Sequence, residues 1–96
     1  INSGKWTAHP FIAPDESYLI FDSEREGGIG KSDLYISFKQ KNGSWGKAIN
    51  MGSEINTSTA ERSGYVSPDG KYFFFNSNLS IHWVDAKIID NLRLKQ

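Results

Sequence analysis

The chain has 96 residues, of which 38% are apolar and 14% aromatic, and its eleven basic and eleven acidic side chains cancel. These scattered, balanced charges do not favour nucleic acid or an anionic membrane surface as a partner, and no apolar run approaches the roughly 20 residues of a membrane-spanning helix. Because there is no cysteine, disulfide frameworks and thiolate metal sites are excluded.

Short strands follow one another along the chain. The first predicted strand is an outer one near residues 4–8. A four-strand unit then covers residues 9–13, 17–22, 33–39 and 45–49. After a linker at residues 50–60, three more strands are predicted at residues 62–67, 71–76 and 80–85. The tail from Ala86 to Leu92 has apolar residues at helical spacing, which predicts one or two helical turns.

Residues 9–23 and 63–77 align without a gap, at an offset of 54 positions. The matched pairs are Phe11 and Tyr65, Pro14 and Pro68, Asp15 and Asp69, Tyr18 and Tyr72, Phe21 and Phe75, and Ser23 and Ser77. Each copy predicts a β-hairpin with a Pro-Asp turn, in which proline presets φ and the aspartate bonds the backbone two residues on. Self-similarity at such a period is typical of propellers and solenoids.

The two predicted turns differ at one position. Gly70 follows Asp69 in the second copy, whereas Glu16 occupies the corresponding place in the first. Because a positive φ favours glycine, we expect the first turn to avoid that conformation at Glu16.

Four-strand antiparallel units of this kind are β-propeller blades, so the fold class is all-β with about two blades. Residues 1–8 are then the outer strand of a preceding blade, and residues 9–49 the first blade. After the linker at residues 50–60, residues 61–96 form a second blade of three strands with a short tail. The outer strand is seen twice, because Ser3-Gly-Lys-Trp6 resembles Asn42-Gly-Ser-Trp45. Residues 46–60 separate Trp45 from Glu61, whereas Thr7, which matches Glu61, directly follows Trp6; either the joint is tight or a segment is missing there, and we favour the second.

Aromatic residues of the hairpins are expected to fill the core between blades. They are Phe11, Tyr18, Phe21, Tyr65, Tyr72, Phe73, Phe74 and Phe75. For Tyr72 in such a core, substitution by alanine is expected to cost about 3–5 kcal/mol.

Several spaced motifs carry a resemblance to a known family. They are Gly-x-Trp, Ile55-Asn56-Thr57 with Glu61, Ser67-Pro68-Asp69-Gly70-Lys71-Tyr72, and Asp33-Leu34-Tyr35 in the other copy. From Gly4 to Leu92 the chain resembles the WD-repeat-like Pro-Asp repeats of TolB-type β-propellers.

The resemblance implies a propeller of six or more blades, outside the cytoplasm of bacteria, in the periplasm or the extracellular space. It also implies that this chain supplies the last blades of a longer protein. Because a blade cannot bury its faces alone, its partners are other blades of the parent chain or further copies, and three copies would supply six blades.

Motifs for catalysis and cofactors are incomplete. Residues 27–32 end like a phosphate-binding loop, but Arg25 stands where its first glycine is required. His9 and His82 lack a ligand triplet, and Asp22, Glu24 and Glu26 lack the glycine and final acid of a calcium loop. No Gly-x-Ser-x-Gly elbow occurs, so Ser63 and Ser67 are assigned to strands or turns. We therefore predict no metal, no cofactor and no catalytic residue, with an enzyme disfavoured.

Three residues are candidates for binding. Glu61, Arg62 and His9 lie at the entrance to innermost strands, where a propeller presents the mouth of its central channel. The alternative for Glu61 is a structural carboxylate that bonds turn amides. A protein, a small molecule or an oligosaccharide would bind there.

The favoured function is a non-catalytic propeller scaffold for protein or ligand binding in a bacterial envelope or secreted protein. One alternative is the accessory propeller of a peptidase or glycosidase whose catalytic residues lie outside this chain. Another is a structural propeller fragment that assembles with copies of itself.

Overall fold

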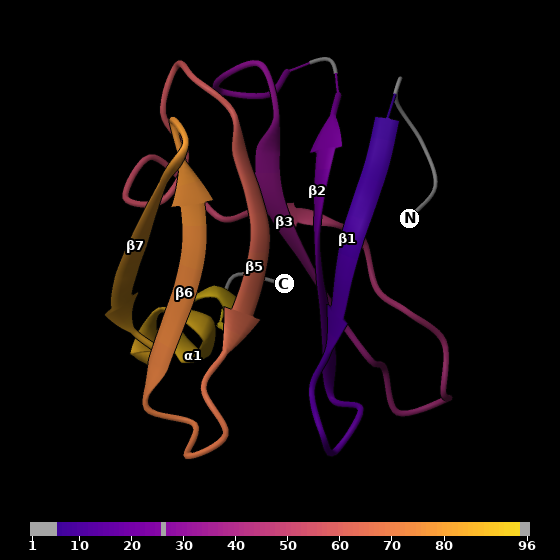
Figure 1. The fold of residues 1–96 in the computed structure, drawn as a ribbon. Coiled ribbons are helices and arrows are strands. Elements are labelled where there is room, and N and C mark those ends of the chain that lie inside the picture. The colour runs from indigo at the N-terminus through magenta and orange to yellow at the C-terminus, as the bar shows by residue number, and fades with distance from the viewer. Residues whose placement is uncertain (1–5, 26, 95–96) are drawn as a thin grey trace.

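The structure is a computed structural model, and it describes residues 6–25 and 27–94. Two antiparallel sheets account for most of its regular structure, as expected for an all-β protein. The first sheet contains β1 (Trp6–Ile12), β2 (Tyr18–Glu24), β3 (Asp33–Phe38) and β4 (Ile49–Asn50), in that order. The second contains β5 (Glu61–Val66), β6 (Tyr72–Ser77) and β7 (Ser80–Asp85), and helix α1 (Lys87–Arg93) follows (Figure 1).

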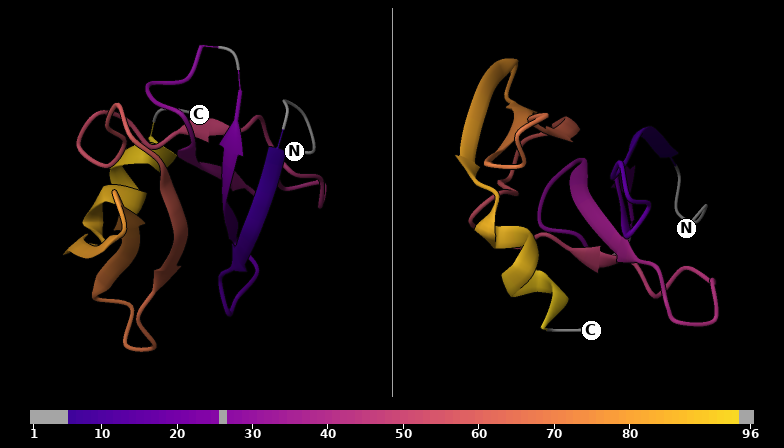
Figure 2. Two further views of the ribbon diagram at one scale, coloured as in Figure 1. Left: turned by 45° about the horizontal axis from the view of Figure 1, so that its top comes forward. Right: turned by 90° about the horizontal axis from the view of Figure 1, so that it is seen from below.

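The two sheets lie side by side, and one apolar core fills the space between them (Figures 1 and 2). Ile20 and Ile36 face this core from the first sheet, and Phe73 and Phe75 face it from the second. All four side chains are at most 5% exposed, so each sheet buries one face against the other.

Helix α1 closes one side of this core. It continues from the end of β7 and lies along the space between the sheets (Figure 2). Ile89 and Leu92 enter the core, while the Arg93 guanidinium stacks over the Phe38 ring at 5.1 Å. The helical spacing in the tail therefore predicted the helix correctly. Within the described residues, no helix has the length and apolarity to cross a bilayer.

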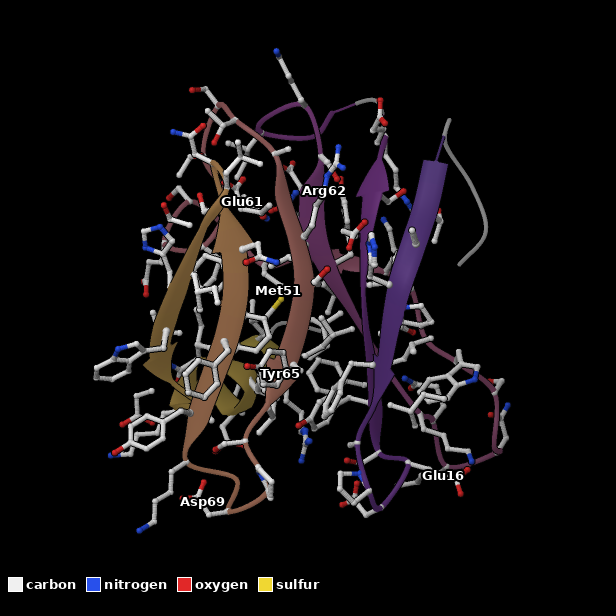
Figure 3. All side chains as sticks on the ribbon, in the orientation of Figure 1. Glu16, Met51, Glu61, Arg62, Tyr65 and Asp69 are labelled. Carbon is white, nitrogen blue, oxygen red and sulfur yellow. The ribbon has the colours of Figure 1, made fainter. Side chains whose placement is uncertain are left out.

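Residues 50–60 were expected to be a linker, and they also build the core. Asn50 belongs to β4, and Met51 lies between the sheets (Figure 3). Met51, Ile55 and Asn56 are at most 2% exposed. The Asn56 side chain accepts the Leu34 N–H (2.8 Å) and donates to the Leu34 carbonyl (3.1 Å), as a neighbouring strand would. These two hydrogen bonds attach the segment to the backbone of β3.

The boundary expected between residues 8 and 9 does not divide two strands. β1 runs from Trp6 to Ile12 and pairs with β2 along both halves. A register shift between Ala8 and Phe11 bends the strand, with His9 at a φ of 50°. The bulge, not a strand end, accounts for the irregular pattern there. The rest of the expected outer strand, residues 4 and 5, lies outside the described residues.

The expectation for Glu16 was wrong. Its φ is 61°, close to the 75° of Gly70. Both turns close with the same bonds, because the N–H of Glu16 donates to the Ala13 carbonyl (2.7 Å) and that of Gly70 to the Ser67 carbonyl (2.8 Å). The geometry of the hairpin thus imposes the left-handed conformation on Glu16 despite its Cβ atom.

The expected aromatic core was correct only in part. Phe73 and Phe75 lie in the core between the sheets. Phe21 is buried in a separate cluster on the opposite face of the first sheet, and Tyr65 and Tyr72 are 46% and 41% exposed. Both tyrosines lie on the face of the second sheet that points away from the first sheet. Strand alternation identified the aromatic positions but did not show that one face lacks a cover.

Candidate functional site

Glu61 is completely buried at the start of β5, and its carboxylate is surrounded by donors. Oε1 accepts the N–H of Thr57 (2.8 Å), and Oε2 accepts the hydroxyls of Ser77 (2.6 Å), Thr57 (2.8 Å) and Thr59 (3.3 Å). These bonds fix the segment before β5 to the end of β6. Glu61 therefore has the geometry of the structural alternative, a carboxylate that bonds turn amides, rather than of a ligand contact.

His9 belongs to a second polar cluster, which joins the two sheets. Its Nδ1 lies 3.0 Å from Oδ2 of Asp22, a carboxylate that is completely buried in β2. The N–H of Ser63 in β5 donates to the same Oδ2 (2.9 Å). Asp22 thus ties the bulge of β1 to the bulge of β5.

A cleft of 590 Å³ opens beside this cluster, between the middle of β1 and the start of β5. Two of the three candidate residues, His9 and Arg62, line it together with Lys31, Ser63 and Asn76. Arg62 lies at the same end of the molecule as Glu61, opposite the hairpin tips that carry Glu16 and Asp69 (Figure 3). The structure therefore brings His9 and Arg62 to one cavity and leaves Glu61 buried behind it.

The charge of the cleft is one-sided. Lys31, Arg62 and His9 supply its ionisable side chains, and none of the described residues that line it is acidic. The neighbouring carboxylates of Asp22 and Glu61 are buried and already accept the hydrogen bonds described above. Such a site favours an anionic group, since the exposed cationic side chains of Lys31 and Arg62 border the hollow.

Sequence reasoning missed three contributors to this region. Asp22 was considered only as a member of an incomplete calcium loop, but it is the buried partner of His9. Lys31 and Asn76 come from a loop and a strand that the sequence does not connect to His9. The offset of 54 positions was a usable signal for Asp22 and Asn76. It pairs these two residues with each other, and it pairs the candidate His9 with Ser63.

The glycine-rich segment at residues 27–32 has a structural role. The N–H groups of Ile29 and Gly30 donate to the buried carboxylate of Asp33, and the Asn50 side-chain amide donates to it as well. A Cβ atom at Gly30 would lie 2.0 Å from the Thr57 carbonyl oxygen. The loop amides therefore bind the Asp33 carboxylate and are not available to a phosphate. The loop also packs against the segment before β5.

The described residues do not form the metal or nucleophilic sites that the sequence motifs resemble in part. Across residues 6–25 and 27–94, no three His, Asp or Glu side chains gather as metal ligands would. Ser67 is a turn residue, because its hydroxyl donates to Asp69 (2.5 Å) and accepts the Tyr72 N–H (3.2 Å). The pKa of Asp69 is lowered by these interactions, first by the Ser67 hydroxyl and then by the Lys71 N–H.

Comparisons of the chain with family models, with curated proteins and with solved structures found no match.

Proposed function

We propose that this chain is a portion of a β-propeller that acts as a non-catalytic binding scaffold, in an envelope or secreted protein of bacteria. The aligned Pro-Asp hairpins and their TolB-like motifs support the propeller. Two antiparallel sheets packed face to face are compatible with it. So are the bulges at His9 and Ser63, which occupy the same place in β1 and β5 with φ values of 50° and 54°.

The observation that carries the binding role is the cleft between β1 and β5. Its basic side chains come from both sheets, with His9 from the first and Arg62 from the second. A ligand held there would span the junction between them. We propose that the preferred ligand is anionic, such as an acidic peptide segment or an acidic oligosaccharide.

Titration followed by nuclear magnetic resonance tests this proposal. A hexaglutamate peptide added to the ¹⁵N-labelled chain should shift amides around Arg62, Ser63 and Lys31, and added salt should weaken the binding. A neutral maltohexaose probe should leave the same amides in place.

Matched variants separate the cleft from general surface charge. Arg62→Gln should weaken hexaglutamate binding, whereas Lys47→Gln, which removes an exposed charge outside the cleft, should not. Equal losses in both variants, or equal shifts at every surface lysine, would refute a specific anion site.

A further inference from the structure

The turn between β6 and β7 presents an apolar side chain at the edge of the cleft. The loop that joins the two strands consists of Asn78 and Leu79 alone. The Leu79 side chain is 101% exposed, and it lines the same cleft as Arg62 and Lys31. Among the described residues, no other large apolar side chain lines this cleft. The basic cleft therefore has a single exposed aliphatic group beside its cations.

Leucine is an unusual residue for this turn. The φ values of Asn78 and Leu79 are 49° and 67°, so both residues are left-handed, as a two-residue hairpin loop requires. Asparagine tolerates this conformation, but the Cβ atom of leucine is crowded in it, and glycine is the usual residue at the second position. The chain has glycine at other left-handed turn positions, with φ values of 87° at Gly43 and 75° at Gly70. Leu79 thus combines backbone strain with full exposure of an apolar side chain.

Hydrogen bonds hold this turn beside the cleft. The Asn78 N–H donates to the carbonyl of Ala60 (3.3 Å), which also lines the cleft. The hydroxyl of Ser77, at the end of β6, donates to the buried Glu61 carboxylate (2.6 Å). Both bonds join the turn to the beginning of β5, so the backbone that carries Leu79 is positioned against the cleft wall.

We propose that Leu79 contacts the ligand of the cleft, and that this ligand carries a large apolar group beside its acidic group. The inference rests on the anionic ligand proposed above and chooses between its two forms. An acidic peptide segment with an aliphatic or aromatic side chain offers both groups, whereas an acidic oligosaccharide offers charge and hydroxyls without such a side chain. Packing that side chain on Leu79 removes apolar surface of both partners from water. Strain and exposure at Leu79 then reduce stability and favour binding, as local strain at functional sites does.

A set of acidic peptides tests the apolar contact by isothermal titration calorimetry. The set contains hexaglutamate and two derivatives, in which the same central glutamate is replaced by leucine or by serine. The two derivatives carry equal charge, so the ratio of their dissociation constants reports the apolar contact. The leucine peptide should bind the unmodified chain about tenfold more tightly than the serine peptide.

Two variants with the same backbone change give the matched comparison. Leu79→Gly should bind both derivatives equally, and its thermal midpoint should rise by a few degrees because glycine fits the turn, which shows that the variant folds. Glu16→Gly relieves the same left-handed conformation, with a φ of 61°, at the opposite end of the molecule. It should keep the tenfold preference for the leucine peptide.

The possible results separate this inference from the proposed function. If hexaglutamate does not bind, the anionic ligand is wrong and the role of Leu79 is overturned with it. If hexaglutamate binds but the two derivatives bind equally, or if Leu79→Gly keeps the preference, only the role of Leu79 is wrong. Oligogalacturonate that binds more tightly than the leucine peptide would also overturn that role and favour an acidic oligosaccharide as the ligand.

Discussion

The two sheets contain similar hairpins, but the neighbouring segments that cover them differ. In the first, every residue of β3 is buried, because the second sheet covers one face while Trp45 and Ala48 pack on the other. In the second, β6 alternates between buried and accessible residues, because only one face is covered. Similar strand sequences thus differ in burial because their neighbours differ, and a strand pattern alone does not say how many of its faces are buried.

A large difference is expected at the centre of the two hairpins, between Ile20 and the corresponding Phe74. Ile20→Ala should destabilise the chain by about 3 kcal/mol, because it empties a fully enclosed site. Phe74→Ala should cost about 1–2 kcal/mol, because that ring keeps one side accessible to solvent. Urea denaturation at micromolar concentration measures both. Equal costs would mean that the outer face of the second sheet is covered in solution.

A similar contrast is expected between Glu61 and Thr7, which are 54 positions apart. Glu61→Ala should cost about 3 kcal/mol, because it leaves the Thr57 N–H and the Ser77 hydroxyl without their acceptor. Thr7→Ala should cost about 0.5–1 kcal/mol, since it removes a neutral hydroxyl pair with Ser23 (3.1 Å). Chemical denaturation would contradict this account if Thr7→Ala proved the more damaging change.

Tyr72 and Tyr18 compare a ring on the uncovered face of the second sheet with a ring that packs against the core. Tyr72→Ala should cost about 1 kcal/mol, well below the value for a core ring, because the ring packs mainly on Phe74 and Trp83. Tyr18→Ala should cost about 2 kcal/mol, because Tyr18 is half-buried against Phe11 and Phe38. A Tyr72→Ala cost above that of Tyr18→Ala in denaturant melts would place Tyr72 in a covered interface.

Exchanging residues between the two turns should have opposite effects. Glu16→Gly should stabilise the chain by about 0.5–1 kcal/mol, because glycine accepts the positive φ without steric cost. Gly70→Ala should destabilise it by a similar amount for the same reason. Both shifts should appear as changes of a few degrees in the thermal midpoint. If Glu16→Gly lowers the midpoint, the Glu16–Lys39 ion pair (3.6 Å) outweighs the backbone strain.

The smallest effect concerns pH. Hydrogen bonds from the Ser17 side chain and N–H lower the pKa of Asp15 below its ordinary 3.8, and those from Ser67 and Lys71 do the same for Asp69. Since the folded chain favours both carboxylates, their contribution is complete above pH 3.8 and is lost as the pH falls through the lower folded pKa values. Asp69→Asn should therefore flatten the acid limb of the stability curve. An unchanged limb would show that the turn gains nothing from the charge.

The sequence was a good guide to local structure. Alternating apolar residues and the Pro-Asp turns predicted the β2, β6 and β7 strands to within a residue or two, and helical spacing predicted α1. It was a poorer guide to the candidate site. His9 and Arg62 do share a cleft, but only the packing of β1 against β5 brings them together, and the burial of Glu61 depends on Thr57, Thr59 and Ser77 around it.

Local sequence was enough to predict the hairpins, their correspondence at 54 positions and the tail helix, because turn chemistry and side-chain period act over a few neighbouring residues. Tertiary structure decided three further things: the left-handed conformation of Glu16, the entry of Met51 and Ile55 into the core, and the exposure of Tyr65 and Trp83. The conformation of Glu16 follows from closure of its hairpin. The other two depend on which distant segment covers a strand, and that choice reflects burial summed over both sheets rather than the preference of any one residue.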